Sequence, residues 1–114
     1  MQSITRDELK RRLDKDRNVK VIEVLPPEEF GTFHLPGAVN VPLMSDDFEQ
    51  RIRNVAPDQD QTVVVYCKNM SCDASRRAAS RLDKLGYHNV FAYEGGKDEW
   101  KRAGLPTESN AQAG

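Results

Sequence analysis

The segment from Thr62 to Arg76 constrains this chain more than any other. It begins with the strand-favouring residues Thr62-Val-Val-Val-Tyr66, which run into Cys67, and a polar stretch follows. An Ala/Arg/Leu-rich amphipathic run then extends from Arg77 to Gly86. This order predicts a strand, a loop and a helix. Cys67 therefore lies where a buried strand ends and a helix follows, the place at which ligands bind in open α/β sheets.

Two interpretations of Cys67 follow from this position. In the first, the cysteine is held as a nucleophilic thiolate, because free backbone N–H groups and the dipole of the following helix favour an anion at this place. The nearby Lys68, Arg76 and Arg77 favour the thiolate further. The alternative is an unreactive cysteine that ends a strand as ordinary core packing. We favour the reactive role because a polar loop and a helix start follow the cysteine directly.

Composition narrows the class of protein. A chain of 114 residues is expected to form one domain with a real core, without disulfides or metals as staples. Its 17 basic and 18 acidic residues are interspersed, giving a net charge of −1, so neither nucleic acid nor a membrane surface is an expected partner. The mean hydropathy is −0.71, and the first residues lack an apolar leader core, so a cytoplasmic location is the expectation. The two cysteines are then expected to be reduced.

Strand and helix signals alternate along the rest of the chain. A capping box, Thr5 to Glu8, predicts a helix that starts at Arg6. The other predicted elements are strands over residues 19–24, 39–42 and 87–93, short helices over 27–30 and 97–102, and a helix capped by Asp46 or Asp47 with Phe48, Ile52 and Val55 on its inner face. We predict a three-layer α/β domain over residues 1–106, with a mostly parallel sheet between helices, and a disordered tail over 107–114.

Three further side chains stand out for their chemistry. Glu23 lies inside an apolar strand pattern, and we interpret it as a buried structural hydrogen-bonding group in preference to a site residue. His34 precedes a Pro-Gly turn, where a brace for the loop is favoured over a general base or a metal ligand. Trp100, the one tryptophan, is predicted to anchor the core.

The motifs of this chain resemble those of the rhodanese homology domain from about Ser3 to Pro106. The motifs that carry the resemblance are Val21-Ile-Glu-Val-Leu-Pro-Pro-Glu-Glu-Phe30, His34-Leu-Pro-Gly-Ala-Val-Asn-Val-Pro42, Val63-Val-Val-Tyr-Cys67, Leu85-Gly-Tyr-His-Asn-Val90, Glu94-Gly-Gly-Lys-Asp-Glu-Trp100 and Gly104-Leu-Pro106. Their order and spacing are specific together. The resemblance implies a rhodanese-like fold and a sulfurtransferase that needs no cofactor or metal.

In that reading Cys67 carries a persulfide taken from a small sulfur-containing anion such as thiosulfate, or from a protein persulfide, and passes the sulfur to cyanide or a thiol acceptor. Backbone N–H groups of the loop are expected to stabilise the thiolate and the persulfide, and Lys68 to pair with the departing sulfite. The predicted donor-binding residues are Lys68, Asn69, Met70, Ser71, Cys72 and Asp73, with Cys72 and Arg76 in auxiliary roles.

The chain departs from the family pattern at two places. Leu25 stands where family members usually carry an arginine, and the usual loop Cys-Arg-x-Gly-x-Arg-Ser is replaced by the longer Cys67-Lys-Asn-Met-Ser-Cys72-Asp-Ala-Ser75, similar to a subgroup with a Cys-x4-Cys loop. Cys72 has three interpretations: it relays the persulfide sulfur, forms a protective disulfide with Cys67, or only lines the loop.

Other classes of function fit less well. Cysteine phosphatases need Cys-x5-Arg, and Asp73 occupies the arginine position. A metal site built on Cys67, Cys72 and His34 has too few ligands. A binding or regulatory module that kept the fold and lost efficient turnover remains the main alternative to an enzyme.

Overall fold

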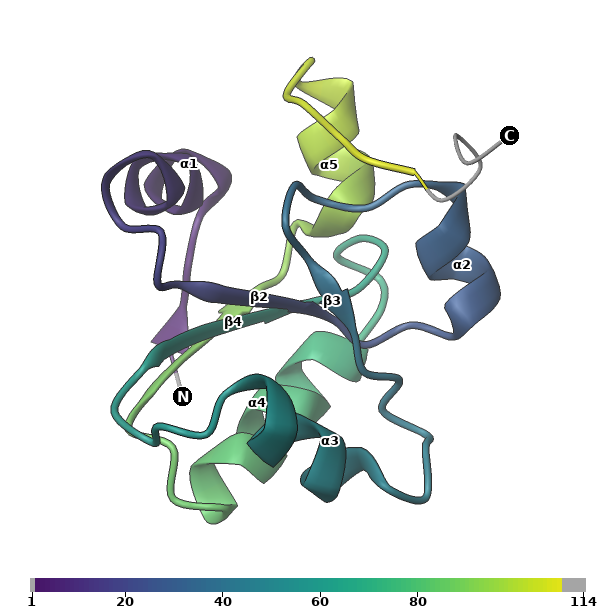
Figure 1. Cartoon of the computed structure of the whole chain (residues 1–114). Helices are drawn as coiled ribbons and strands as arrows, with labels where there is room; N and C mark the ends of the chain where they lie inside the picture. The colour runs from purple at the N-terminus through teal and green to yellow at the C-terminus, as the bar shows by residue number, and fades with distance from the viewer. Residues whose placement is uncertain (1, 110–114) are drawn as a thin grey trace.

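The computed structural model describes residues 2–109 and contains five strands and five helices in that range. The strands pair only in parallel, in the order β1-β5-β4-β2-β3. Figure 1 shows α1 and α5 on one face of the sheet, α3 and α4 on the other, and α2 beside the ends of the strands. The predicted α/β architecture is therefore confirmed. The elements are β1 Gln2–Ser3, α1 Arg6–Lys15, β2 Lys20–Glu23, α2 Pro27–Thr32, β3 Val39–Asn40, α3 Phe48–Val55, β4 Thr62–Tyr66, α4 Ala74–Lys84, β5 Asn89–Tyr93 and α5 Gly96–Arg102.

Alternate residues of β4 divide the core into two layers. Val63 and Val65 lie in the apolar cluster shared with α3 and α4, whereas Val64 and Tyr66 lie in the cluster that includes Leu9 and Trp100. Successive side chains of a strand point to opposite faces, so a central strand covered by helices on both sides is apolar throughout. Trp100 is 1% exposed and its indole N–H donates to the carbonyl of Pro106 at 2.7 Å, in agreement with the predicted anchor role.

The ends of several elements differ from those predicted. Helix α1 begins at Arg6 as predicted, because Thr5 Oγ1 accepts the N–H of Glu8 at 3.2 Å. Helix α4 begins at Ala74, three residues before the predicted start, so the loop after Cys67 is shorter than expected. Asp47 and Asp73 occupy the positions preceding α3 and α4, but neither side chain makes a capping hydrogen bond.

The predicted tail is described only in its first part. Glu108 forms an antiparallel bridge with His34, with the N–H of each donating to the carbonyl of the other at 2.8 and 2.9 Å. The N–H of Gly37 also donates to Glu108 Oε1 at 3.0 Å. Residues 107–109 are thus attached to the loop after α2 where the sequence predicts disorder, and the rest of the predicted tail, 110–114, lies outside the described residues.

Candidate active site

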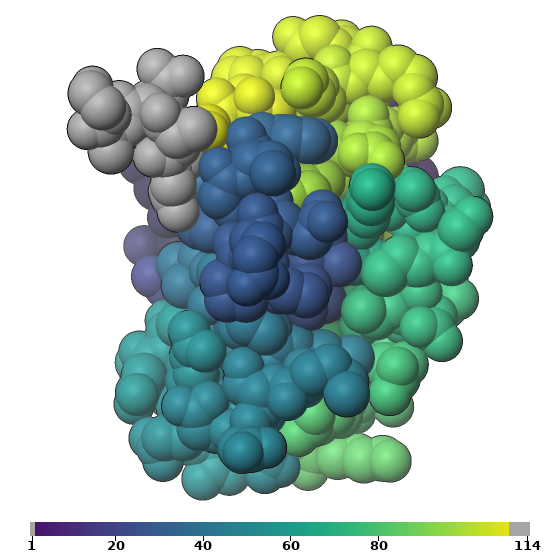
Figure 2. Space-filling model, turned by 90° about the vertical axis from the view of Figure 1, so that its right-hand side faces the viewer, coloured from purple at the N-terminus to yellow at the C-terminus, as the bar shows by residue number. Residues whose placement is uncertain are grey.

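Cys67 lies directly after β4, at the end of the sheet that is formed by the carboxyl ends of its parallel strands. Glu23 of β2 and Tyr93 of β5 both pair with Tyr66 in the strand register, so all three strands finish level with one another just before the cysteine. Figure 2 faces the side of the molecule onto which these ends open, with α2 near the centre of that face. Cys67 itself is 1% exposed, beneath residues 68–73 of the loop that leads into α4.

The groups around the Cys67 sulfur favour the neutral thiol over the thiolate. Cys67 Sγ donates to the carbonyl oxygen of Cys72 at 3.3 Å, and the side chain of Cys72 is a further influence on the sulfur. The backbone N–H and the side chain of Ser75 favour the thiolate and oppose these effects only in part. Burial, followed by the Cys72 contact, raises the pKa of Cys67 to about 11. The predicted thiolate is therefore wrong for this conformation of the loop, because burial favours the neutral thiol, which donates its proton to a carbonyl.

The raised pKa makes a prediction for chemical reactivity. Only the thiolate is alkylated by iodoacetamide, so with a pKa of about 11 we expect the alkylation rate of Cys67 to rise about tenfold per pH unit between pH 7 and pH 10. Peptide-resolved mass spectrometry separates Cys67 from Cys72. In urea-unfolded protein, the matched control, the rate should level off near the ordinary cysteine pKa of about 8.5. A plateau at pH 7–8 in the folded protein would mean that the loop already stabilises the thiolate.

Backbone contacts with α5 hold the start of the loop. The N–H of Lys97 donates to the carbonyl of Cys67 at 3.1 Å, and the N–H of Asp98 donates to that of Lys68 at 3.0 Å. Gly96 makes this approach possible: its φ is +74°, and a Cβ there would lie 2.5 Å from the carbonyl carbon and oxygen of Lys68. The Gly95-Gly96 pair is therefore part of the support of the cysteine loop.

The rest of the loop folds back around Asn69. Its carbonyl accepts the N–H of Cys72 at 3.1 Å, and its side-chain oxygen accepts the N–H of Ser71 at 3.0 Å. This local turn returns the chain toward the sulfur. Among the predicted donor-binding residues, Asn69 and Cys72 are half-buried, whereas Lys68, Met70, Ser71 and Asp73 are exposed, Met70 at 69%.

Arg76 pairs with a carboxylate. It forms an ion pair with Glu94 at 2.9 Å, and the Ser3 hydroxyl donates to the other oxygen of the same carboxylate at 2.6 Å. These two hydrogen bonds hold the pKa of Glu94 below its ordinary value. The structure thus brings Cys72 to the sulfur but directs the guanidinium of Arg76 to the end of β5. Its auxiliary role stays a prediction.

Ser75 is a site residue that the sequence reasoning missed. Ser75 is fully buried. Within residues 2–109 its hydroxyl oxygen has no hydrogen-bond partner. It nevertheless lies close enough to the Cys67 sulfur to oppose the increase in the pKa of that thiol. A signal was present, because Ser75 precedes Ala78, Ala79 and Leu82 at the spacing of one helix face, and all of these are buried. A hydroxyl in an otherwise apolar helix stripe indicates a polar partner in the core.

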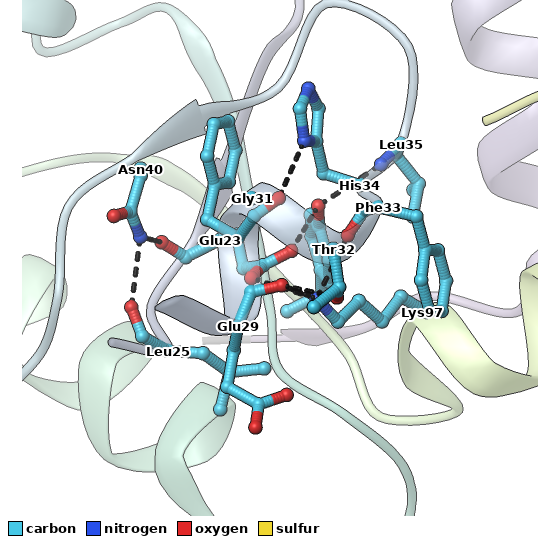
Figure 3. A network of polar contacts seen from close by, with 12 residues as sticks. Glu23, Leu25, Glu29, Gly31, Thr32, Phe33, His34, Leu35, Asn40 and Lys97 are labelled. Carbon is cyan, nitrogen blue, oxygen red and sulfur yellow. Dashed lines mark hydrogen bonds and ion pairs between the residues drawn. The ribbon is translucent and has the colours of Figure 1, made fainter. Parts of the chain in front are cut away.

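Leu25 places an apolar side chain beside the cysteine loop. It is half-buried and packs against the apolar cluster that contains Cys67, as do Cys72 and Ala74. The carbonyl of Leu25 accepts the side-chain N–H of Asn40 at 2.8 Å, a contact visible in Figure 3. The position where family members usually carry an arginine is therefore apolar here.

A buried ion pair lies under α2, away from the sulfur. Lys97 Nζ is 3.1 Å from Glu23 Oε2 and also donates to the carbonyls of Glu29 and Phe33 at 2.6 and 2.8 Å, as Figure 3 shows. Tyr66 donates its hydroxyl to the other oxygen of Glu23 at 2.9 Å. Burial raises the pKa of Glu23 even though Lys97 opposes this. The structural interpretation of Glu23 is confirmed.

His34 has a bracing role. One ring nitrogen contacts the carbonyl of Phe30 at 2.9 Å, the other lies 3.9 Å from Glu108, and the ring stacks on Phe30 with centroids 3.8 Å apart. Within residues 2–109 no group of three or more His, Cys, Asp or Glu side chains is placed to hold a metal ion. The helices of the same range are all too short or too polar to span a membrane.

Comparison with known proteins agrees with this geometry. Residues 5–103 match the model of the rhodanese-like domain. The chain belongs to the rhodanese-like family. It is 30% identical to the thiosulfate:glutathione sulfurtransferase of Saccharomyces cerevisiae, covering 88% of this chain and 78% of that protein. The crystal structure of a thiosulfate sulfurtransferase from Pseudomonas aeruginosa superposes with a TM-score of 0.84 at 26% identity, covering 96% of this chain and 20% of that one.

Another relative has a different description. The chain is 33% identical to an HTH-type transcriptional regulator of Mycobacterium tuberculosis, over 98% of this chain and 47% of that protein. The chain thus spans about half of the regulator's length. The family therefore supports sulfur transfer in general, and it includes relatives described as regulators.

Proposed function

We propose that this rhodanese-like domain is a sulfurtransferase in which Cys67 carries the transferred sulfur as a persulfide. One observation supports the proposal most strongly: the cysteine follows the central strand of the sheet and lies against the first turn of α4, in a chain whose relatives include thiosulfate sulfurtransferases. Helix N-termini and free N–H groups at this edge stabilise an anionic sulfur.

The proposed reaction has two transfers. The Cys67 thiolate attacks the outer sulfur of thiosulfate, a sulfur–sulfur bond forms, and sulfite leaves with the electron pair of the bond that breaks. An acceptor thiolate or cyanide then attacks the outer sulfur of the persulfide and restores the Cys67 thiolate. Lys68, exposed beside the cysteine, is the cation nearest in sequence for the departing sulfite. A protein persulfide is the alternative donor.

The buried thiol sets a condition on the first transfer. Cys67 must lose its proton and the Cys72 carbonyl must turn away from the sulfur before attack, because the carbonyl repels a thiolate. The Ser75 N–H and hydroxyl remain beside the sulfur to donate to the anion.

The proposal is tested by the fate of one sulfur atom. Protein incubated with thiosulfate and freed of excess donor should gain the mass of one sulfur on the Cys67 peptide, and cyanide should remove it as thiocyanate. A second arm uses an organic persulfide as donor. If neither donor places sulfur on the protein and neither yields thiocyanate or hydrosulfide, the chain is instead a binding or regulatory module, as its buried thiol and its regulator relative would then suggest.

A further inference from the structure

The half-buried Cys72 is the second thiol at this site, and the two proposed transfers use no bond to its sulfur. Both cysteines are free, Cys67 Sγ donates to the Cys72 carbonyl at 3.3 Å, and the Cys72 side chain is near enough to raise the pKa of Cys67. The turn at Asn69 positions this residue, because the Asn69 carbonyl holds the N–H of Cys72 at 3.1 Å. The backbone of the loop therefore holds Cys72 against the Cys67 side chain.

We propose that Cys72 attacks the Cys67 persulfide and releases its outer sulfur as hydrosulfide, which gives the domain a second activity, the reduction of sulfane sulfur. This inference rests on the proposed function, since it starts from the loaded Cys67. It assigns to Cys72 the role of a resolving thiol and to a small external thiol the role of final reductant.

Access to the loaded sulfur favours the internal thiol over an external one. Cys67 is 1% exposed, so an acceptor from solution has to open the loop, whereas Cys72 already packs against the same apolar cluster. A reacting group held in place has an effective concentration that no dissolved thiol reaches. Cys72 also lies two residues before the first residue of helix α4, so the turn into this helix fixes its position in the chain.

The step balances without a further reactant. The Cys72 sulfur bonds to the inner sulfur of the Cys67 persulfide, and the bond between the inner and outer sulfurs breaks. The outer sulfur leaves with that electron pair and the Cys72 proton, as hydrosulfide. The sulfane sulfur gains two electrons, and the Cys67 and Cys72 sulfurs together lose two in forming a disulfide. Two equivalents of an external thiol then reduce this disulfide and complete the cycle.

The partial exposure of Cys72 favours reduction of the Cys67–Cys72 disulfide by an external thiol. A reductant must reach one sulfur of the disulfide, and Cys72 is the more accessible of the two cysteines. Exposed Ser71 and Met70 precede it in the loop, so the loop can move without disturbing β4. Cys72 is therefore the sulfur at which an external thiol is expected to attack.

The experiment follows the loaded protein after the donor is removed. Wild-type protein and Cys72→Ser are loaded with an organic persulfide, and intact mass, disulfide content and hydrosulfide are measured over time without reductant. We expect wild type to lose its extra sulfur at least about tenfold faster than Cys72→Ser. It should release one hydrosulfide per chain and end with a Cys67–Cys72 disulfide. Added glutathione should make the release continue. Ser80→Ala, on the exposed side of α4, is the control and should behave as wild type.

Each contrary outcome has a distinct meaning. Equal lifetimes in wild type and Cys72→Ser, with no disulfide, would overturn the inference and leave the proposed function intact. Failure of Cys72→Ser to load would overturn it as well, because Cys72 would then belong to the first transfer. Failure of both proteins to load, from the organic persulfide and from thiosulfate alike, would refute the proposed function. Oxidised glutathione provides an independent check, since absence of an intramolecular disulfide after its addition would show that the two sulfurs cannot meet.

Discussion

Replacing Cys67 with serine is expected to abolish both sulfur loading from thiosulfate and thiocyanate formation. Serine has no sulfur on which a persulfide can form, and it keeps nearly the same volume in a site that is 1% exposed. Because Cys67 is the proposed nucleophile, we expect the rate to fall by about a thousandfold or more, to the uncatalysed background. The mass shift and the colorimetric thiocyanate assay measure the two effects separately.

The control for this variant is its stability. An unchanged urea midpoint would show that Cys67→Ser is folded and that the loss is chemical. Persistent loading in the variant would contradict the assignment and would direct attention to Cys72, the other free cysteine. A module that only binds a partner would give the opposite pattern, since partner binding would survive the substitution and no sulfur would be transferred by either protein.

The parts of the fold that depend on neighbours in sequence were predictable. The Thr5–Glu8 capping box fixes the start of α1 through contacts three residues apart. The apolar run before Cys67 gave a central strand because such runs occur where both faces of a sheet are covered. Alternation of these signals was sufficient for the parallel α/β architecture. The start of α4 was misplaced because Ser75, a polar residue, was assigned to the loop when it belongs to the buried face of the helix.

The chemistry of the site depended on contacts that the sequence does not show. A thiolate at Cys67 was predicted from the N–H groups and dipole of the following helix, with the nearby basic residues as further support. The guanidinium of Arg76 instead pairs with Glu94, 18 positions away, and Lys68 is exposed. Burial, followed by the side chain of Cys72 five residues further along, raises the pKa of the cysteine. Neither can be derived from charge spacing, because both depend on how the loop turns back at Asn69.

The buried pair of Glu23 and Lys97 leads to the second large effect. The two residues are 74 positions apart, and their side chains are 0% and 1% exposed. We expect Lys97→Met to lower the free energy of unfolding by about 3–5 kcal/mol at pH 7, the range found when one partner of a buried ion pair is removed. The substitution leaves a buried carboxylate without its cation, and it leaves the carbonyls of Glu29 and Phe33 without their donor. Urea denaturation followed by circular dichroism measures the loss.

The pH dependence of Lys97→Met distinguishes this electrostatic cause from lost packing. The pKa of Glu23 is already raised by burial, and removing Lys97 takes away the interactions that oppose the increase. A carboxyl whose folded pKa exceeds its unfolded pKa stabilises the protein at low pH, and this contribution is lost as the pH rises through the folded value. Lys97→Met should therefore lose less stability at pH 5 than at pH 7.

A second substitution and a control on the same helix complete the test. The double variant with Lys97→Met and Glu23→Gln should recover part of the lost stability at pH 7, because a neutral amide needs no cation and can still accept the hydrogen bond from Tyr66. Its stability should not share the pH dependence of the single Lys97→Met variant, because the amide does not titrate. Lys101→Met removes an exposed ammonium that lies over the ring of Phe33, as Lys97 does, and should cost at most about 1 kcal/mol. Equal losses in the single and double Lys97 variants at both pH values would instead attribute the effect to the packing of the lysine side chain, and the charge of Glu23 would then contribute nothing.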